Sequence, residues 1–167
     1  GELYFLNNIL VKKLNIRECI LSWTGPSKKH DFTLLNLLIE IKTTSVKSNN
    51  KIRTSSTDQL SPVYEKKLFL NFLKLEKKSN GRNLNEIVDE IEESIQKDDY
   101  ILNEFNLKLM KVGYLKDHKT FYDEKFYFLE EKYFYIDKNF PYLEKKKIPQ
   151  PDSIEEIQFT YTINLDK

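Results

Sequence analysis

Two carboxylates and one lysine flank an apolar run of this chain with a spacing that could assemble a hydrolytic site. Asp31 precedes the run, and Glu40 and Lys42 lie at its end. The run itself, residues 33–41, is rich in Leu and Ile and predicts strand structure with a bend near Asn36. Because side chains alternate along a strand, Glu40 and Lys42 share one face. A hairpin at the bend would bring Asp31 beside Glu40.

Such a group at a sheet edge has a definite chemistry. Carboxylates can hold a hard divalent cation, which activates a water and neutralises charge on a phosphate. A lysine beside the cation can assist proton transfer if its own pKa is lowered. A Glu-x-Lys triplet at a strand end is also common on solvated sheet edges, so the triplet alone leaves a purely structural interpretation open.

The first half of the chain supplies elements that could position this group. Apolar periodicity predicts a helix over residues 2–14, a strand over 16–23 and a turn over 24–27. After the central run comes a polar loop over 43–58, with a short strand at 51–54. A short helix or turn at 58–64 and a fourth strand at 67–75 complete this half.

The second half begins after a turn-rich segment at residues 77–81, which predicts a linker. Asn83 and Glu86 have the spacing of a capping box at the start of a helix. A second helix is expected over 100–112, with Gly113 as its C-terminal stop. Two aromatic runs at 126–129 and 133–136 predict a hairpin, and alternation over 157–165 predicts a last strand.

These elements predict an α/β protein with a mixed sheet flanked by helices. We expect a core over residues 1–78 and a C-terminal lobe of helices and strands over 79–167. The order of elements in that lobe is similar to a winged helix, which is an analogy of order alone.

Composition narrows the class of protein. The 167 residues are 40% hydrophobic and 32% charged, with a formal net charge of +1, as in a soluble globular protein that net charge does not steer toward nucleic acid or membrane. No apolar run has the length of a membrane span, and Glu2 interrupts the opening residues where a signal peptide would be apolar. The single Cys19 cannot form an internal disulfide, which favours a reducing cytoplasm.

Acidic and basic residues are distributed unevenly along the chain. Residues 22–60 contain six basic and three acidic side chains, whereas residues 84–105 contain eight acidic side chains and one lysine. A phosphate backbone would be drawn to the first segment and repelled by the second.

The motif around the central run resembles the active-site signature of the PD-(D/E)XK nuclease superfamily. Further segments extend the similarity over nearly the whole chain, to a bacterial family of PD-(D/E)XK proteins found among restriction and phage-defence genes. Members of that family extend further at the N-terminus. The segments are Gly1-Glu2-Leu3, Trp23-Thr24-Gly25-Pro26, Lys29-His30-Asp31-Phe32, Glu40-Ile41-Lys42-Thr43-Thr44, Ser55-Ser56, Asp58-Gln59-Leu60, Val112-Gly113-Tyr114 and Phe140-Pro141-Tyr142-Leu143.

The resemblance implies a restriction-endonuclease-like fold and a role for each matching residue. Asp31 and Glu40 would bind Mg²⁺, with Mn²⁺ as the alternative ion. The backbone carbonyl of Ile41 would be a further ligand, and Lys42 would orient or deprotonate the attacking water. Glu2 matches an additional acidic residue of many relatives.

The chain departs from the family pattern at two positions and matches it at one further polar residue. Gln59 matches a polar catalytic residue of some relatives. Val63 stands where those relatives have an aromatic residue, although Tyr64 is adjacent. His30 replaces the proline of the motif, and we expect it to be a surface residue or a DNA contact, as we expect His118 to lie in a loop.

Three functions follow as hypotheses. The first is metal-dependent hydrolysis of DNA phosphodiester bonds in restriction or phage defence, where double-strand cleavage would favour a homodimer. The second is a catalytically silent DNA-binding module of a defence complex. The third is an assembly subunit in which the helix face around Ile91 docks a partner.

Overall fold

Four strands form a mixed sheet at the centre of the computed structural model, in the order β1-β2-β4-β5. β2 and β4 run parallel, whereas β1 and β5 are antiparallel to their neighbours. The structure describes residues 1–25, 28–45, 50–54, 59–95, 97–143 and 161–166. The predicted α/β class with a mixed sheet is confirmed. The strands are β1 (Phe32–Thr33), β2 (Leu37–Ser45), β4 (Lys67–Arg82) and β5 (Phe126–Tyr135).

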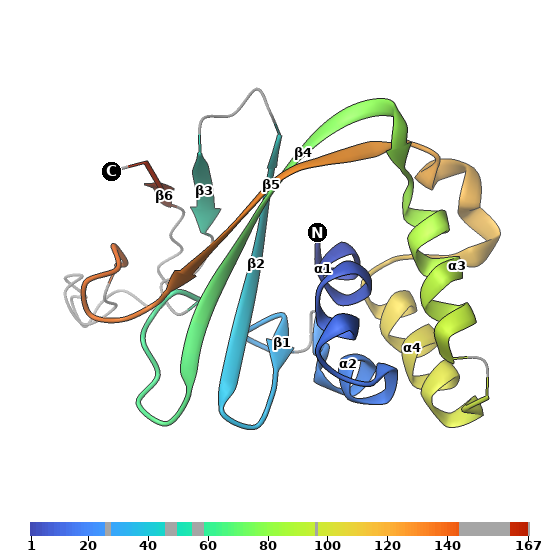
Figure 1. The fold of residues 1–167 in the computed structure, drawn as a ribbon, viewed down its shortest axis with the longest axis horizontal. Coiled ribbons are helices and arrows are strands. Elements are labelled where there is room, and N and C mark those ends of the chain that lie inside the picture. The colour runs from blue at the N-terminus through green and yellow to red at the C-terminus, as the bar shows by residue number, and fades with distance from the viewer. Residues whose placement is uncertain (26–27, 46–49, 55–58, 96, 144–160, 167) are drawn as a thin grey trace, which may run out of the picture.

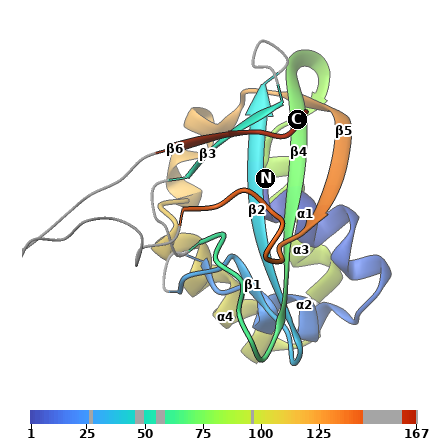
Figure 2. The same cartoon turned by 90° about the vertical axis from the view of Figure 1, so that its left-hand side faces the viewer.

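Helices cover one face of this sheet, and a second, two-stranded sheet covers part of the other (Figure 1). Figure 2 is viewed from the side of the small sheet, in which β3 (Lys51–Thr54) and β6 (Tyr161–Asn164) pair antiparallel. The helices are α1 (Glu2–Asn8), η1 (Leu10–Lys12), α2 (Ile16–Ser22), α3 (Leu84–Ile95), α4 (Asp99–Lys111) and η3 (Lys116–Tyr122).

Strand alternation divides the buried apolar side chains into two clusters. Ile39 and Ile41 of β2 pack with the helices, whereas Leu38 packs with residues of β3 and β6. Successive side chains of a strand point to opposite faces of the sheet. The side chains of Glu40 and Lys42 therefore point to the same side of the sheet as Leu38, away from the helices.

The predicted hairpin of the central run is confirmed. Phe32 pairs with Ile39 and Thr33 with Leu38, and the bend includes Asn36. Continued by one residue, this register places Asp31 opposite Glu40.

The strand predicted over residues 16–23 is wrong, because most of that segment forms α2. Asn15 caps the helix, and its side-chain oxygen accepts a hydrogen bond from the backbone N–H of Glu18 at 2.9 Å. Ile16, Cys19 and Ile20 have helical spacing, and the latter two are fully buried. A short apolar run fits a strand or a helix equally well, and here the cap decides for the helix.

The linker predicted over residues 77–81 is also wrong, because this segment lies inside the 16-residue strand β4. Lys77 and Arg82 both pair with Phe126, so the residues between them form a local irregularity of the ladder. Elements on both sides of residue 78 share the main sheet and the helix-side cluster. The division into a core of 1–78 and a lobe of 79–167 stays a prediction.

The hairpin predicted within residues 126–136 is replaced by the single strand β5. Its charged centre contains no turn residue and instead pairs with β4, with Glu130 opposite Lys74 and Lys132 opposite Phe72. Because β5 is the last strand of the sheet, polar side chains are tolerated there.

The helices of the second half follow the sequence closely. Asn83 and Glu86 exchange side-chain to backbone hydrogen bonds of 3.0 and 2.8 Å, which confirms the capping box. Gly113 follows α4 with a φ of 85°, a backbone conformation that glycine adopts at little cost. Ile91 has no exposed surface, so the helix face around it packs in the core and is not open to a partner.

The cap of α2 provides a test of the helix assignment. Replacing the exposed Asn15 with Ala removes the acceptor for the Glu18 N–H and should lower the free energy of unfolding by about 1 kcal/mol. Asn15→Asp, which retains a capping oxygen, should stay within a few tenths of a kcal/mol of wild type. Urea unfolding of the three proteins measures this difference. Equal stability of the Ala and Asp variants would contradict the cap.

Candidate active site

Asp31 is held at the open edge of β2 by a backbone hydrogen bond. Its Oδ2 accepts from the N–H of Ile41 at 2.7 Å. The backbone N–H and C=O of one strand residue point toward the same neighbour, so the Ile41 carbonyl is directed to this edge as well. The structure therefore places Asp31 and the Ile41 carbonyl at one edge of β2, and their role as metal ligands stays a prediction.

The segment before Asp31 is fixed from two directions. The Thr24 N–H donates to the Asp31 carbonyl oxygen at 2.9 Å, and the Thr24 hydroxyl donates to the His30 carbonyl oxygen. Lys108 of α4 donates to the carbonyl oxygens of Ile20, at 2.7 Å, and of Trp23 at the end of α2. A cation is favourable at a helix C-terminus. These contacts tie the Asp31 loop to the helical layer.

Glu40 and Lys42 form a buried ion pair on the same face of β2. The Lys42 Nζ lies 2.7 Å from the Glu40 Oε1, and only 2% of the Glu40 side chain is exposed. Lys42 also donates to the Gln59 Oε1 at 3.2 Å. The structure thus brings Gln59, from the turn at residues 59–60, to the predicted catalytic lysine. Its amide oxygen helps to orient the ammonium.

The negative charges of Glu40 and Glu2 act on the ionisation of Asp31. The pKa of Asp31 is raised from 3.8 to about 7, first by burial and then by the negative charges of Glu40 and Glu2. The Ile41 N–H and the Lys42 ammonium act in the opposite direction. Among the described side chains that act on the pKa of Asp31, the two other carboxylates outnumber the single ammonium of Lys42. This imbalance penalises ionisation of Asp31.

Glu2 lies near the group but is engaged elsewhere. Its Oε2 accepts a hydrogen bond from the indole N–H of Trp23 at 2.7 Å. Trp23 is almost fully buried against Phe105, as expected for a packing residue. Glu2 therefore adds negative charge near Asp31, while one of its oxygens fixes the indole. Its role as a metal ligand stays a prediction.

His30 is a site residue that sequence reasoning missed. It was expected at the surface, but it is only 5% exposed, and its Nδ1 lies 3.8 Å from the Glu40 Oε2. It belongs to an irregular bend before β1, where side-chain directions do not follow strand alternation. Its position next to Asp31 was the only sequence signal, and that signal did not indicate the direction of the ring.

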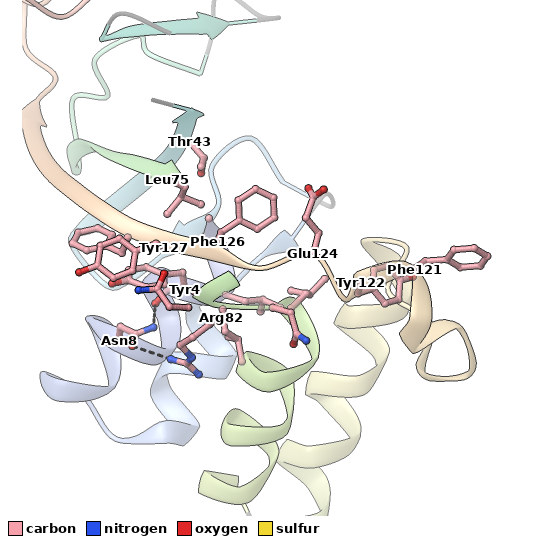
Figure 3. Close-up of a pocket in the computed structure, with 18 residues that line it drawn as sticks. Tyr4, Asn8, Thr43, Leu75, Arg82, Phe121, Tyr122, Glu124, Phe126 and Tyr127 are labelled. Carbon is pink, nitrogen blue, oxygen red and sulfur yellow. Dashed lines mark hydrogen bonds between the residues drawn. The ribbon is translucent and has the colours of Figure 1, made fainter. Parts of the chain in front are cut away.

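A separate apolar cavity of about 730 Å³ lies between α1, α3 and the far ends of β4 and β5. Figure 3 shows Tyr4, Arg82, Phe126 and Tyr127 around it. Thr43 also lines the cavity, and it points to the face of β2 opposite to that of Lys42. This cavity is therefore not the space in front of the two carboxylates.

The donor set suits a divalent cation. In the described part of the chain, no three His, Cys, Asp or Glu side chains lie together as a preformed metal cluster. Mg²⁺ needs fewer protein ligands, because it is usually bound by one or two carboxylates, with water and phosphate oxygens as its other ligands. The Glu40 Oε2 is buried and has no hydrogen-bond partner among the described residues, and its neighbour Asp31 resists ionisation. A cation would give the Glu40 Oε2 a partner and would favour ionisation of Asp31.

The fold and the edge group define a protein with a nuclease-like α/β architecture. Residues 1–166 match the model of a family described as "Putative PD-(D/E)XK family member, (DUF4420)". The chain belongs to this family. No curated protein and no solved structure matched the chain. Among the described residues, no helix has both the length and the apolar character needed to cross a membrane.

The raised pKa of Asp31 gives a pH-dependent test in metal-free buffer. Between pH 3.8 and about 7 the native protein retains a proton that the unfolded chain loses, so the free energy of unfolding falls as pH rises. Asp31→Asn keeps an acceptor for the Ile41 N–H, but its amide does not titrate, so its free energy of unfolding should not fall in this way as pH rises. Relative to wild type, the variant should gain on the order of 2–4 kcal/mol between pH 4 and pH 8.

Urea unfolding with EDTA at several pH values measures this gain. Glu93→Gln, which removes an exposed carboxylate of α3, is the control and should show no such trend. A constant difference between Asp31→Asn and wild type across the range would contradict a raised Asp31 pKa.

Proposed function

We propose that this protein is a metal-dependent DNA endonuclease acting in restriction or phage defence. One observation supports the proposal: Asp31 is bonded to the Ile41 N–H at the edge of β2, and on the same strand Lys42 pairs with Glu40 and is bonded to Gln59. The family membership supports a nuclease-like chemistry for this group. The defence role and the bacterial setting rest on the resemblance of the sequence segments alone.

Asp31, Glu40 and the Ile41 carbonyl would hold Mg²⁺ or Mn²⁺, with Glu2 as an additional acidic residue. The bound ion would lower the pKa of a water molecule and neutralise charge on the scissile phosphate. The protein's part is to fix the ligands. The Ile41 N–H orients Asp31, and Lys42 holds one oxygen of Glu40.

Lys42 would position the attacking water and offset negative charge on the phosphate. Its side chain is 19% exposed, and its contacts with Glu40 and Gln59 restrict the motion of the ammonium. A restrained donor contributes more than a mobile one, because little orientational freedom is lost at the moment of reaction.

Charge around the group favours a polyanionic substrate. Lys51 and Arg53 are exposed on β3, which lies on the same side of the main sheet as Glu40 and Lys42. Lys28 and Lys29 are exposed just before Asp31. Basic side chains on several elements around a cleavage site would contact the DNA backbone and make binding sensitive to salt.

Replacing Lys42 with Ala tests the proposal. Metal-dependent cleavage of plasmid DNA by the purified protein should fall by at least about a hundredfold, because the group that positions the water is lost. The matched control is Lys116→Ala, which removes a lysine paired with Glu92 far from the site and should leave cleavage unchanged. EDTA should abolish cleavage by both wild type and control.

Two results would overturn this function. Equal cleavage by wild type and Lys42→Ala would place the activity outside this group. Salt-sensitive DNA binding without cleavage, unchanged by Lys42→Ala, would instead support a silent DNA-binding module of a defence complex.

A further inference from the structure

His30 and Glu40 direct two buried polar atoms toward each other across a gap. The His30 Nδ1 and the Glu40 Oε2 are 3.8 Å apart, which is too long for a hydrogen bond. Both imidazole nitrogens and this carboxylate oxygen are buried without a hydrogen-bond partner among the described residues. Buried polar atoms are rarely left unsatisfied, because each costs free energy. The gap therefore calls for a bridging species.

The charges around the gap favour a cation over a water molecule. The other oxygen of Glu40 is already paired with Lys42, so the Oε2 is the one available to a ligand. The carboxyl group of Asp31 interacts with that of Glu40 and with that of Glu2, so a divalent cation bound to Glu40 would also favour ionisation of Asp31. A bridging water would satisfy the hydrogen-bonding atoms but leave the excess negative charge, whereas a divalent cation would neutralise it.

We propose that His30 is a ligand of the divalent cation, sharing it with Glu40, and that this nitrogen ligand biases the site toward Mn²⁺ over Mg²⁺. The proposal rests on the proposed function, whose motif includes no histidine. Mg²⁺ takes oxygen ligands almost exclusively. Mn²⁺ also favours oxygen ligands, but as a first-row transition-metal ion it accepts an imidazole nitrogen more readily than Mg²⁺ does. Water, phosphate and backbone oxygens would complete the coordination.

Electron paramagnetic resonance of Mn²⁺ bound to the full-length protein tests this directly. The chain contains two histidines, so a directly coordinated imidazole nitrogen can come only from His30 or His118. In wild type we expect a ¹⁴N coupling, which changes to ¹⁵N when the protein is labelled with ¹⁵N-histidine. His118→Gln, at an exposed position in η3, should retain the coupling.

His30→Leu should remove the coupling and weaken Mn²⁺ binding by roughly tenfold or more, with a smaller change for Mg²⁺. Circular dichroism checks that this variant folds. If it does not, ¹⁵N-histidine-labelled His118→Gln decides the question, because His30 is then the only histidine left in the chain. Mn²⁺ bound without nitrogen coupling, or a coupling lost in His118→Gln, would overturn His30 ligation and leave the endonuclease proposal standing. Wild type that binds Mg²⁺ but no Mn²⁺ would overturn His30 ligation alone, and wild type that binds neither ion would overturn both proposals.

Discussion

The site depends on two carboxylates, the buried Glu40 and the half-buried Asp31, being held near each other against their mutual repulsion. The N–H of Ile41 holds Asp31, and the ammonium of Lys42 holds Glu40. Neither partner balances the full charge, and the pKa of Asp31 consequently rises to about 7. A site built in this way therefore favours the binding of a cation. The hairpin of β1 and β2 supports this geometry, because its register, continued by one residue, sets Asp31 opposite Glu40.

The remaining elements support that hairpin from both faces of the sheet. Helices α2 and α4 anchor the loop before Asp31 through Thr24 and Lys108. On the opposite face, the turn that contains Gln59 restrains Lys42. The parallel pairing with β4 keeps β2 central, which buries Glu40 almost completely and strengthens its pairing with Lys42.

The hairpin and its charged residues could be predicted from sequence because strand alternation and a bend at Asn36 determine which side chains meet. The same reasoning failed where local pattern is ambiguous. The segment of α2 is too short for its apolar period to distinguish helix from strand, and β4 continues through a turn-rich composition because pairing with β5 resumes at Arg82. The direction of His30 depends on an irregular bend, which no periodicity encodes.

A crystal structure of the protein grown with Mn²⁺ would test the central claim most directly. The account predicts an anomalous-scattering peak within coordination distance of carboxylate oxygens from both Asp31 and Glu40, at the open edge of β2. A fully occupied Mn²⁺ bound elsewhere, with Asp31 still bonded only to the Ile41 N–H and no peak between the carboxylates, would contradict it.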